Sequence, residues 1–140
     1  MRDDFDSMEA VSEYSIFDTD RIHDELENGR IDIALLLAAT MAETGLRYEL
    51  IDYLGISPSN FDELRGRATL GYHLNKCNEK DIIDKQYRES FEALRDKRNN
   101  LAHDIGYRDK LVQDDKEAQE VKSVIEDCCE WFDSRPPYPR

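Results

Sequence analysis

The chain has 140 residues, a formal net charge of −13 and 39% hydrophobic residues. A chain of this length forms one ordinary domain, whose core needs no metal or disulfide to hold it together. Its longest apolar run is too short to span a membrane and its acidic N-terminus lacks the apolar stretch of a secretion signal, so we expect a cytoplasmic protein.

Two helices are predicted in the first part of the chain. Residues 1–17 are acidic and have no clear pattern, so we expect a weakly ordered N-terminus. N-cap candidates at residues 18–20 predict a helix that ends near Gly29. The next segment, residues 30–54, is apolar over a wide arc, which predicts a central helix contacted from several sides and ended by Gly55.

A third helix is predicted from the start signal at residues 57–60 to about residue 78. Pro58 stands in a first-turn position, and Glu63 follows Asn60 by three residues, as in a capping box. Gly66 and Gly71 weaken the pattern, so the helix can break there.

The fourth predicted helix, residues 81–103, carries an apolar stripe that an arginine interrupts. Steps of three or four residues link the apolar members of the stripe, which are Ile83, Tyr87, Phe91 and Leu94. The next steps land on Arg98 and Leu101. We expect the two aromatic residues to lie in the core or in a dimer seam, and Arg98 to be buried or to face a cleft.

A last helix is predicted over residues 114–133, followed by a Pro-rich, extended tail at residues 134–140. No segment alternates like a strand. The predicted fold is therefore all-α, an antiparallel bundle of four to five helices over residues 18–133. The three cysteines are Cys77, Cys128 and Cys129, an odd number that makes a poor disulfide framework, so we expect them to be reduced and structural.

Arg98, Asn99 and His103 are the candidate catalytic residues. Arginine is a fixed cation suited to phosphate, histidine can move a proton near neutral pH, and the amide can orient the imidazole or donate to a phosphate oxygen. RNA supplies its own nucleophile, the 2′-OH, so its cleavage requires a base, an acid and charge stabilisation but no metal. No metal-ligand spacing is present in the sequence, and we expect no metal and no cofactor.

These residues cannot all point one way from a straight helix. Asn99 and His103 are four apart and share a face, whereas Arg98 and His103 are five apart and diverge by about 140°. They can converge if the helix bends or unwinds near Asn100, or if two copies of the chain pool their residues across a two-fold axis.

Each candidate also has a purely structural explanation. Arg98 could pair with Glu92, Asp96 or an acid of the last helix, and a histidine at the C-terminal end of a helix is favoured by the dipole. The neighbouring Arg95 and Lys97 either widen a phosphate-binding surface or are ordinary solvated charges. We expect the remaining histidines, His23 and His73, to lie on the surface.

The stretch from Leu94 to His103, with the sequence LRDKRNNLAH, resembles the signature of the HEPN superfamily. That signature is an Arg followed by a polar residue and, four to six positions later, a His, and Arg98, Asn99 and His103 match it. The order of segments is also similar, with a helix like residues 28–37, a middle part like residues 69–72, the motif helix and a closing helix. The resemblance covers about residues 18–133.

This resemblance implies a helical bundle that dimerises through the motif helix, with the motif in the cleft between protomers. It further implies a metal-independent endoribonuclease of toxin or defence type, with RNA as substrate and a nucleotidyltransferase-like antitoxin as partner. Other members are nucleotide-binding proteins or have no known activity, so two alternatives stay open. One is a non-catalytic module that works by dimerisation or partner binding, which the strong negative charge favours. The other is a nucleotide-binding regulator in which Arg98 holds a phosphate.

Overall fold

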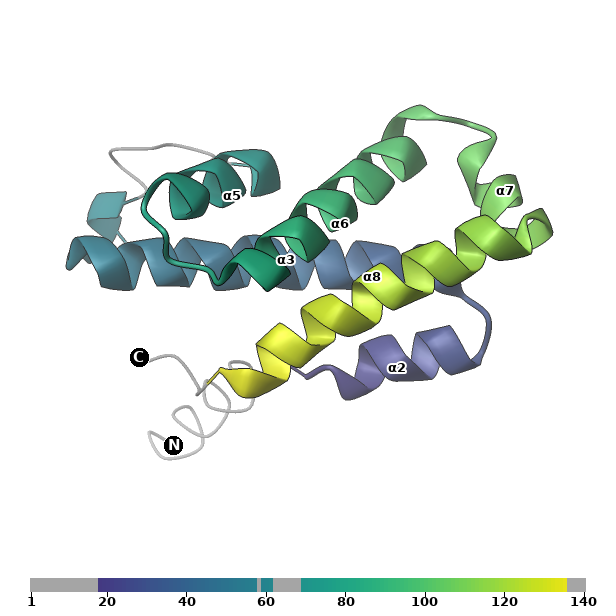
Figure 1. The fold of residues 1–140 in the computed structure, drawn as a ribbon, viewed down its shortest axis with the longest axis horizontal. Coiled ribbons are helices and arrows are strands. Elements are labelled where there is room, and N and C mark those ends of the chain that lie inside the picture. The colour runs from purple at the N-terminus through teal and green to yellow at the C-terminus, as the bar shows by residue number, and fades with distance from the viewer. Residues whose placement is uncertain (1–17, 58, 62–68, 136–140) are drawn as a thin grey trace, which may run out of the picture.

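A computed structural model describes residues 18–57, 59–61 and 69–135 of the chain. In these ranges all the elements are helices, which confirms the predicted all-α class (Figure 1). Their bounds are α2 (Asp20–Glu27), α3 (Ile31–Leu54), α5 (Leu70–Glu79), α6 (Lys85–His103), α7 (Tyr107–Gln113) and α8 (Asp115–Ser134). Within the same ranges, no helix is both long enough and apolar enough to cross a membrane. The predicted weakly ordered N-terminus, residues 1–17, and residues 136–140 of the predicted tail lie outside the described residues.

The long helix α3 is the centre of the molecule, as the wide apolar arc predicts. It contacts α2, α5, α6, α7 and α8, which cover it on several sides in Figure 1. Its fully buried side chains include Leu35, Ala38, Ala42 and Leu46. The helix ends where predicted, because Gly55 adopts a left-handed conformation with φ of 65°, which costs a glycine little.

Helices α5 and α6 form an antiparallel hairpin. The hydroxyl of Thr69 caps α5 by accepting a hydrogen bond from the Tyr72 amide at 3.3 Å. Helix α6 begins at Lys85 rather than at residue 81, because Asp81 has a left-handed backbone with φ of 53° that breaks the helical path. Ile83, the first member of the predicted stripe, therefore lies in the turn before α6, and its side chain is buried there.

Helices α6 and α8 also run antiparallel, and their side chains pair at both ends of the contact. Near the start of α6, the hydroxyl of Tyr87 donates to Glu130 of α8 at 3.3 Å. Near its end, the Lys97 ammonium donates to Glu117 at the start of α8 at 2.5 Å. Between the two pairs, Phe91 is fully buried against an edge of Trp131, with ring centroids 5.1 Å apart. Of the two predicted places, the core and a dimer seam, Phe91 lies in the core.

Helix α7 has no counterpart in the sequence-based prediction. It is a short helix between the predicted fourth and last helices, and it buries only Tyr107 and Leu111. Two apolar contacts in seven residues give too weak a periodic signal to detect in the sequence. Asp114 then ends α7 and caps α8, because its carboxylate accepts hydrogen bonds from the Lys116 and Glu117 amides.

All three cysteines are buried and none forms a disulfide, as predicted. The Sγ atom of Cys77 lies 3.7 Å from the Leu46 carbonyl oxygen of α3. Burial raises the pKa of Cys77 and that of Cys129 to about 12, and it raises the pKa of Cys128 well above its usual value. The thiols therefore stay protonated at neutral pH and act as small apolar side chains.

Candidate functional site

The three predicted catalytic residues lie in the last two turns of α6. The helix is continuous through Asn100 and ends at His103, and the Asp104 amide still donates to the Asn100 carbonyl at 2.9 Å. The unwinding at Asn100 that could have brought Arg98 and His103 together is therefore not present. Their Cα atoms are separated by about 7.5 Å along the axis and by about 140° around it. From a straight α6, the two side chains therefore leave on different sides, with Arg98 half-buried and His103 exposed.

Arg98 emerges from the buried stripe of α6 and is half-buried, whereas Asn99 and His103 lie on its exposed outer side. The acids that could have neutralised Arg98 from its own helix have other partners. Glu92 accepts a hydrogen bond from Asn78 at 3.2 Å, and Asp96 pairs with Arg95 at 3.3 Å. Among residues 18–57, 59–61 and 69–135, no hydrogen bond or ion pair forms at Arg98.

Arg98 differs in its partners from three other arginines of the described helices and their ends. Arg30, Arg88 and Arg135 each form an ion pair with a carboxylate, with Glu25, Asp81 and Glu49 in turn. A partly desolvated guanidinium without such an acid retains its full capacity to bind an anion. This is the property that a phosphate-binding residue requires.

The two weaker candidates, Arg95 and Lys97, are already engaged. The stem of Arg95 passes over α5, where a Cβ atom at Gly71 would lie 3.6 Å from the Arg95 Cδ, and its guanidinium pairs with Asp96. Lys97 is directed at α8, where it contacts Glu117 and, at 3.5 Å, Glu120. Either side chain would have to leave an acid partner to contact a phosphate.

The Lys97 ion pair belongs to a polar cluster that joins α6, α7 and α8. The Tyr107 hydroxyl donates to the same Glu117 carboxylate oxygen at 2.8 Å, and the Asn100 side chain also interacts with that hydroxyl. The side chains of Lys97 and Glu117 are only 14% and 13% exposed, and Tyr107 is 3% exposed. We call Lys97, Tyr107, Glu117 and Asn100 the α6–α8 polar cluster. The contacts of this cluster, and the part played by Tyr107 and Glu117, were not predicted, because nothing in the local sequence joins positions twenty residues apart.

The electrostatics of the α6–α8 polar cluster favour its charged form. The hydrogen bond from Lys97 lowers the pKa of Glu117, although burial partly opposes it. Burial lowers the pKa of Lys97, but the hydrogen bond to Glu117 and the charges of Glu117 and Glu120 raise it more, so that its pKa lies above its usual value. Burial, and then the bond to Glu117, raises the pKa of Tyr107. All three groups keep their ordinary protonation states across the neutral range.

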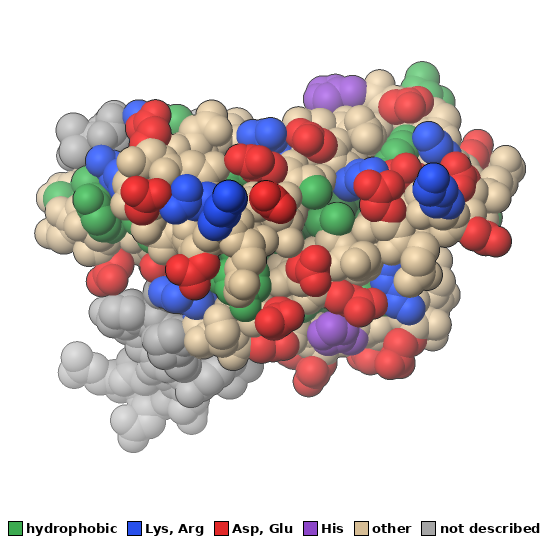
Figure 2. Space-filling view, viewed as in Figure 1, with side chains coloured by type: hydrophobic (Ala, Val, Ile, Leu, Met, Phe, Trp, Pro, Cys, Tyr) green, Lys and Arg blue, Asp and Glu red, His purple; other side chains and the backbone are tan. Residues whose placement is uncertain are grey.

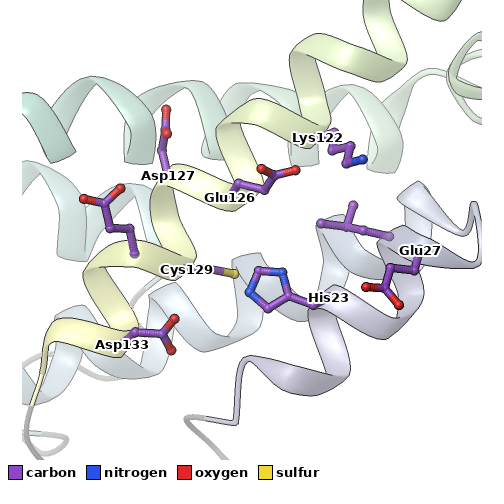
Figure 3. A pocket seen from close by; sticks show the side chains of 9 residues that line it. His23, Glu27, Lys122, Glu126, Asp127, Cys129 and Asp133 are labelled. Carbon is purple, nitrogen blue, oxygen red and sulfur yellow. The ribbon is translucent and has the colours of Figure 1, made fainter.

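The other two histidines are placed differently from one another. His73 of α5 is 2% exposed and lies between the rings of Phe61 and Tyr72, so its predicted surface position is wrong. The hydrophobic packing of α5 on α3 buries this side of the helix, whatever polar residue it carries. His23 of α2 is half-buried and lines a groove between α2 and α8 (Figure 3).

That groove has a volume of about 540 Å³, which is large enough to hold a small ligand. Figure 3 shows the His23 ring and the Cys129 sulfur directed into it, with carboxylates around them. Its remaining lining residues are Leu26, Glu27, Lys122, Glu126, Asp127, Glu130 and Asp133. In the part of the chain that the structure describes, no group of three or more His, Cys, Asp and Glu side chains is arranged to hold a metal ion.

Comparison of the chain with family models, with curated proteins and with solved structures found no match to any of them.

Proposed function

We propose that the protein is a metal-independent endoribonuclease of toxin or defence type, and that its active site is composed of Arg98, Asn99 and His103. The observation that supports this most directly is the state of Arg98. It is half-buried on an otherwise apolar stripe, and no acid neutralises it within the described residues. An exposed amide and an exposed imidazole follow it within the next five residues.

The proposed reaction is an intramolecular transfer within RNA. The 2′-oxygen forms a bond to the neighbouring phosphorus, the 5′-oxygen leaves, and the products carry a 2′,3′-cyclic phosphate and a 5′-hydroxyl. His103 takes the proton from the 2′-hydroxyl as that oxygen attacks, and the imidazolium so formed delivers it to the leaving 5′-oxygen. Arg98 stabilises the charge that develops on the non-bridging oxygens, and Asn99 orients the imidazole on their shared side of α6.

The proposal includes a homodimer, because a single α6 directs Arg98 and His103 apart. A second copy related by a two-fold axis, with its α6 facing the first, would supply the missing group to each half of a shared cleft. The HEPN-like motif supports the same arrangement. A nucleotidyltransferase-like antitoxin is the partner that this function implies, and such a gene beside this one would support the toxin type.

The decisive experiment is RNA cleavage by the purified protein in excess EDTA, with the ends of the products identified. Cleavage should persist and leave 2′,3′-cyclic phosphate. His103→Ala should lower the rate by roughly 10²- to 10⁴-fold, the usual contribution of a general acid or base. His23→Ala on α2 is the matched control and should cleave at the wild-type rate. If His103→Ala were as fast as the wild type, the role given to His103 would be wrong.

A second candidate function is a non-catalytic interaction module, and the surface charge favours it. On the face shown in Figure 2, acidic side chains are spread among the basic ones, and no broad basic surface is present on that face. A net charge of −13 also repels RNA at long range. This function predicts no RNA binding at working salt and no cleavage, together with a stable complex with a partner protein.

A further inference from the structure

The α6–α8 polar cluster is placed where an apolar contact would be the simpler way to join two helices. Lys97 and Glu117 are largely removed from solvent, and the free-energy cost of removing two charges from water offsets much of what their attraction contributes. The main effect of such a pair is on the relative orientation of the two helices and not on the free energy of folding. A hydrogen bond requires particular distances and angles, whereas apolar side chains can slide past one another. The cluster is therefore suited to fix an orientation.

The orientation that it fixes is that of the last two turns of α6. Lys97 directly precedes Arg98, and Asn100 directly follows Asn99. Lys97 contacts Glu117, whereas Asn100 interacts with the Tyr107 hydroxyl, which itself donates to Glu117. The segment that carries the candidate residues thus contacts α8 through Lys97, before the Arg98–Asn99 pair, and α7 through Asn100, after it.

Tyr107 is the member that joins these contacts. Its hydroxyl donates to Glu117 at 2.8 Å, while its ring is buried and anchors the start of α7. It also stands four residues after His103, so it restrains the chain beyond the end of α6 as well as the helix before it. Without the hydroxyl, α7 would still be packed by its ring, but its link to the polar contacts of α6 would be lost.

We propose that Tyr107 is a positioning residue for the candidate site: its hydroxyl, bonded to Glu117 and through it to Lys97, holds the end of α6 in the orientation in which Arg98 and His103 can face a phosphodiester. This inference rests on the proposed ribonuclease function for its catalytic consequence. Its structural half, that the hydroxyl restrains the end of α6, can be measured without any substrate.

The chain offers a matched pair of variants for the test. Tyr107→Phe removes one hydroxyl and keeps the buried ring. Tyr87→Phe removes the hydroxyl of the other tyrosine that donates to a glutamate of α8, at the opposite end of the same helix pair. Both variants of the full chain are examined by amide hydrogen exchange and by RNA cleavage in EDTA.

We expect Tyr107→Phe to speed exchange at the amides of residues 99–103 by roughly fivefold, the factor that one lost buried hydrogen bond gives. Exchange in α3 should be unchanged in this variant, and Tyr87→Phe should alter neither region. In cleavage, Tyr107→Phe should lower kcat by about tenfold at an unchanged KM, because misplaced groups slow the chemical step more than they weaken binding.

The possible results separate the two proposals. If residues 99–103 exchange at the wild-type rate in Tyr107→Phe, the positioning role is overturned, whatever the cleavage result. If exchange changes there while kcat stays at the wild-type value, the hydroxyl restrains the helix but does not serve catalysis, and the inference is again overturned. A wild-type protein that cleaves no RNA would overturn the proposed function instead, while the exchange comparison would still decide whether Tyr107 restrains α6.

Discussion

The two ends of the contact between α6 and α8 are built from different chemistry. Near the start of α6, three aromatic rings meet edge to face, with Phe91 lying 5.1 Å from Trp131 and 6.0 Å from Phe132. A polar link there, the hydrogen bond from Tyr87 to Glu130, is exposed. Near the end of α6, the contact is the α6–α8 polar cluster, with its hydrogen-bonded ammonium, carboxylate and hydroxyl groups.

We infer that one end of this helix pair mainly stabilises the fold and that the other mainly fixes the orientation of α6. Apolar burial supplies most of the favourable free energy of folding and is not directional, so the aromatic end is suited to hold the helices together. Hydrogen bonds to charged groups are directional and contribute less net free energy. The polar end is therefore suited to orient the last turns of α6, which carry the residues of the candidate site.

The largest expected effect is that of Phe91→Ala. This removes a fully buried ring from the aromatic end, and a substitution of this kind costs about 3–5 kcal/mol of stability. Chemical denaturation measures the loss, and Val112→Ala, at a 76% exposed apolar residue, is a control expected to cost less than about 0.5 kcal/mol. A cost of Phe91→Ala near that of the control would show that the aromatic end does not carry the stability assigned to it.

Glu117→Gln should have a smaller effect, about 1–2 kcal/mol. The value lies between those of exposed and of fully buried ion pairs, because Gln keeps the shape and one acceptor but leaves the Lys97 charge facing only Glu120. Glu79→Gln breaks the exposed pair of Glu79 with Lys76 and should cost no more than about 0.5 kcal/mol. If Glu117→Gln cost as much as Phe91→Ala, the contrast between the two ends would disappear.

Asp114→Ala should cost about 1 kcal/mol, the usual contribution of an N-cap. Its carboxylate caps α8 through the Lys116 and Glu117 amides and so also sets the start of the helix that carries Glu117. Asp114→Asn keeps an accepting oxygen and should recover most of the loss. Thermal unfolding of the two variants checks this, and an equal loss in both would show that charge rather than capping is responsible.

The smallest expected effect is a pH dependence at the polar end. The hydrogen bond from Lys97 lowers the pKa of Glu117 in the folded protein, so the stability due to its ionised form is complete above its unfolded pKa of about 4.3. That stability is lost as the pH falls through the lower, folded pKa. The difference in unfolding free energy between the wild type and Glu117→Gln should be constant from about pH 6 to 8 and should shrink below about pH 4.5. A difference that grew on acidification would contradict this direction.

Much of the fold was predictable because local patterns in the sequence, such as the spacing of apolar residues and glycines, indicate the helices. The apolar arc of residues 30–54 and the glycine after it predicted α3 and its end, and the stripe from Tyr87 to Leu94 predicted the buried side of α6. The candidate residues were also found locally, since Arg98 interrupts a regular pattern. The surface position predicted for His73 was wrong because packing of α5 on α3 buries that side of the helix, and the predicted start of α6 was wrong because of the left-handed backbone at Asp81.

The supporting contacts of the site could not be predicted in the same way. The partner of Lys97 lies on another helix, and any of the chain's many acidic residues could have filled that place. Tyr107 lies in a short helix that the spacing of apolar residues does not predict. The sequence therefore suggested the candidate residues, but not the contacts of α6 with α7 and α8 beside them.

Because the thiols of Cys77, Cys128 and Cys129 are buried, a cysteine introduced at the surface can be labelled selectively. Maleimide and methanethiosulfonate reagents attack thiolates in contact with solvent, and none of the native sulfurs offers one at neutral pH. A nitroxide attached to an Asn99→Cys variant would therefore report from a single, chosen place on each polypeptide. The distance between the unpaired electrons of two such labels would show whether the outer sides of two α6 helices lie close together. The native cysteines would not have to be replaced first.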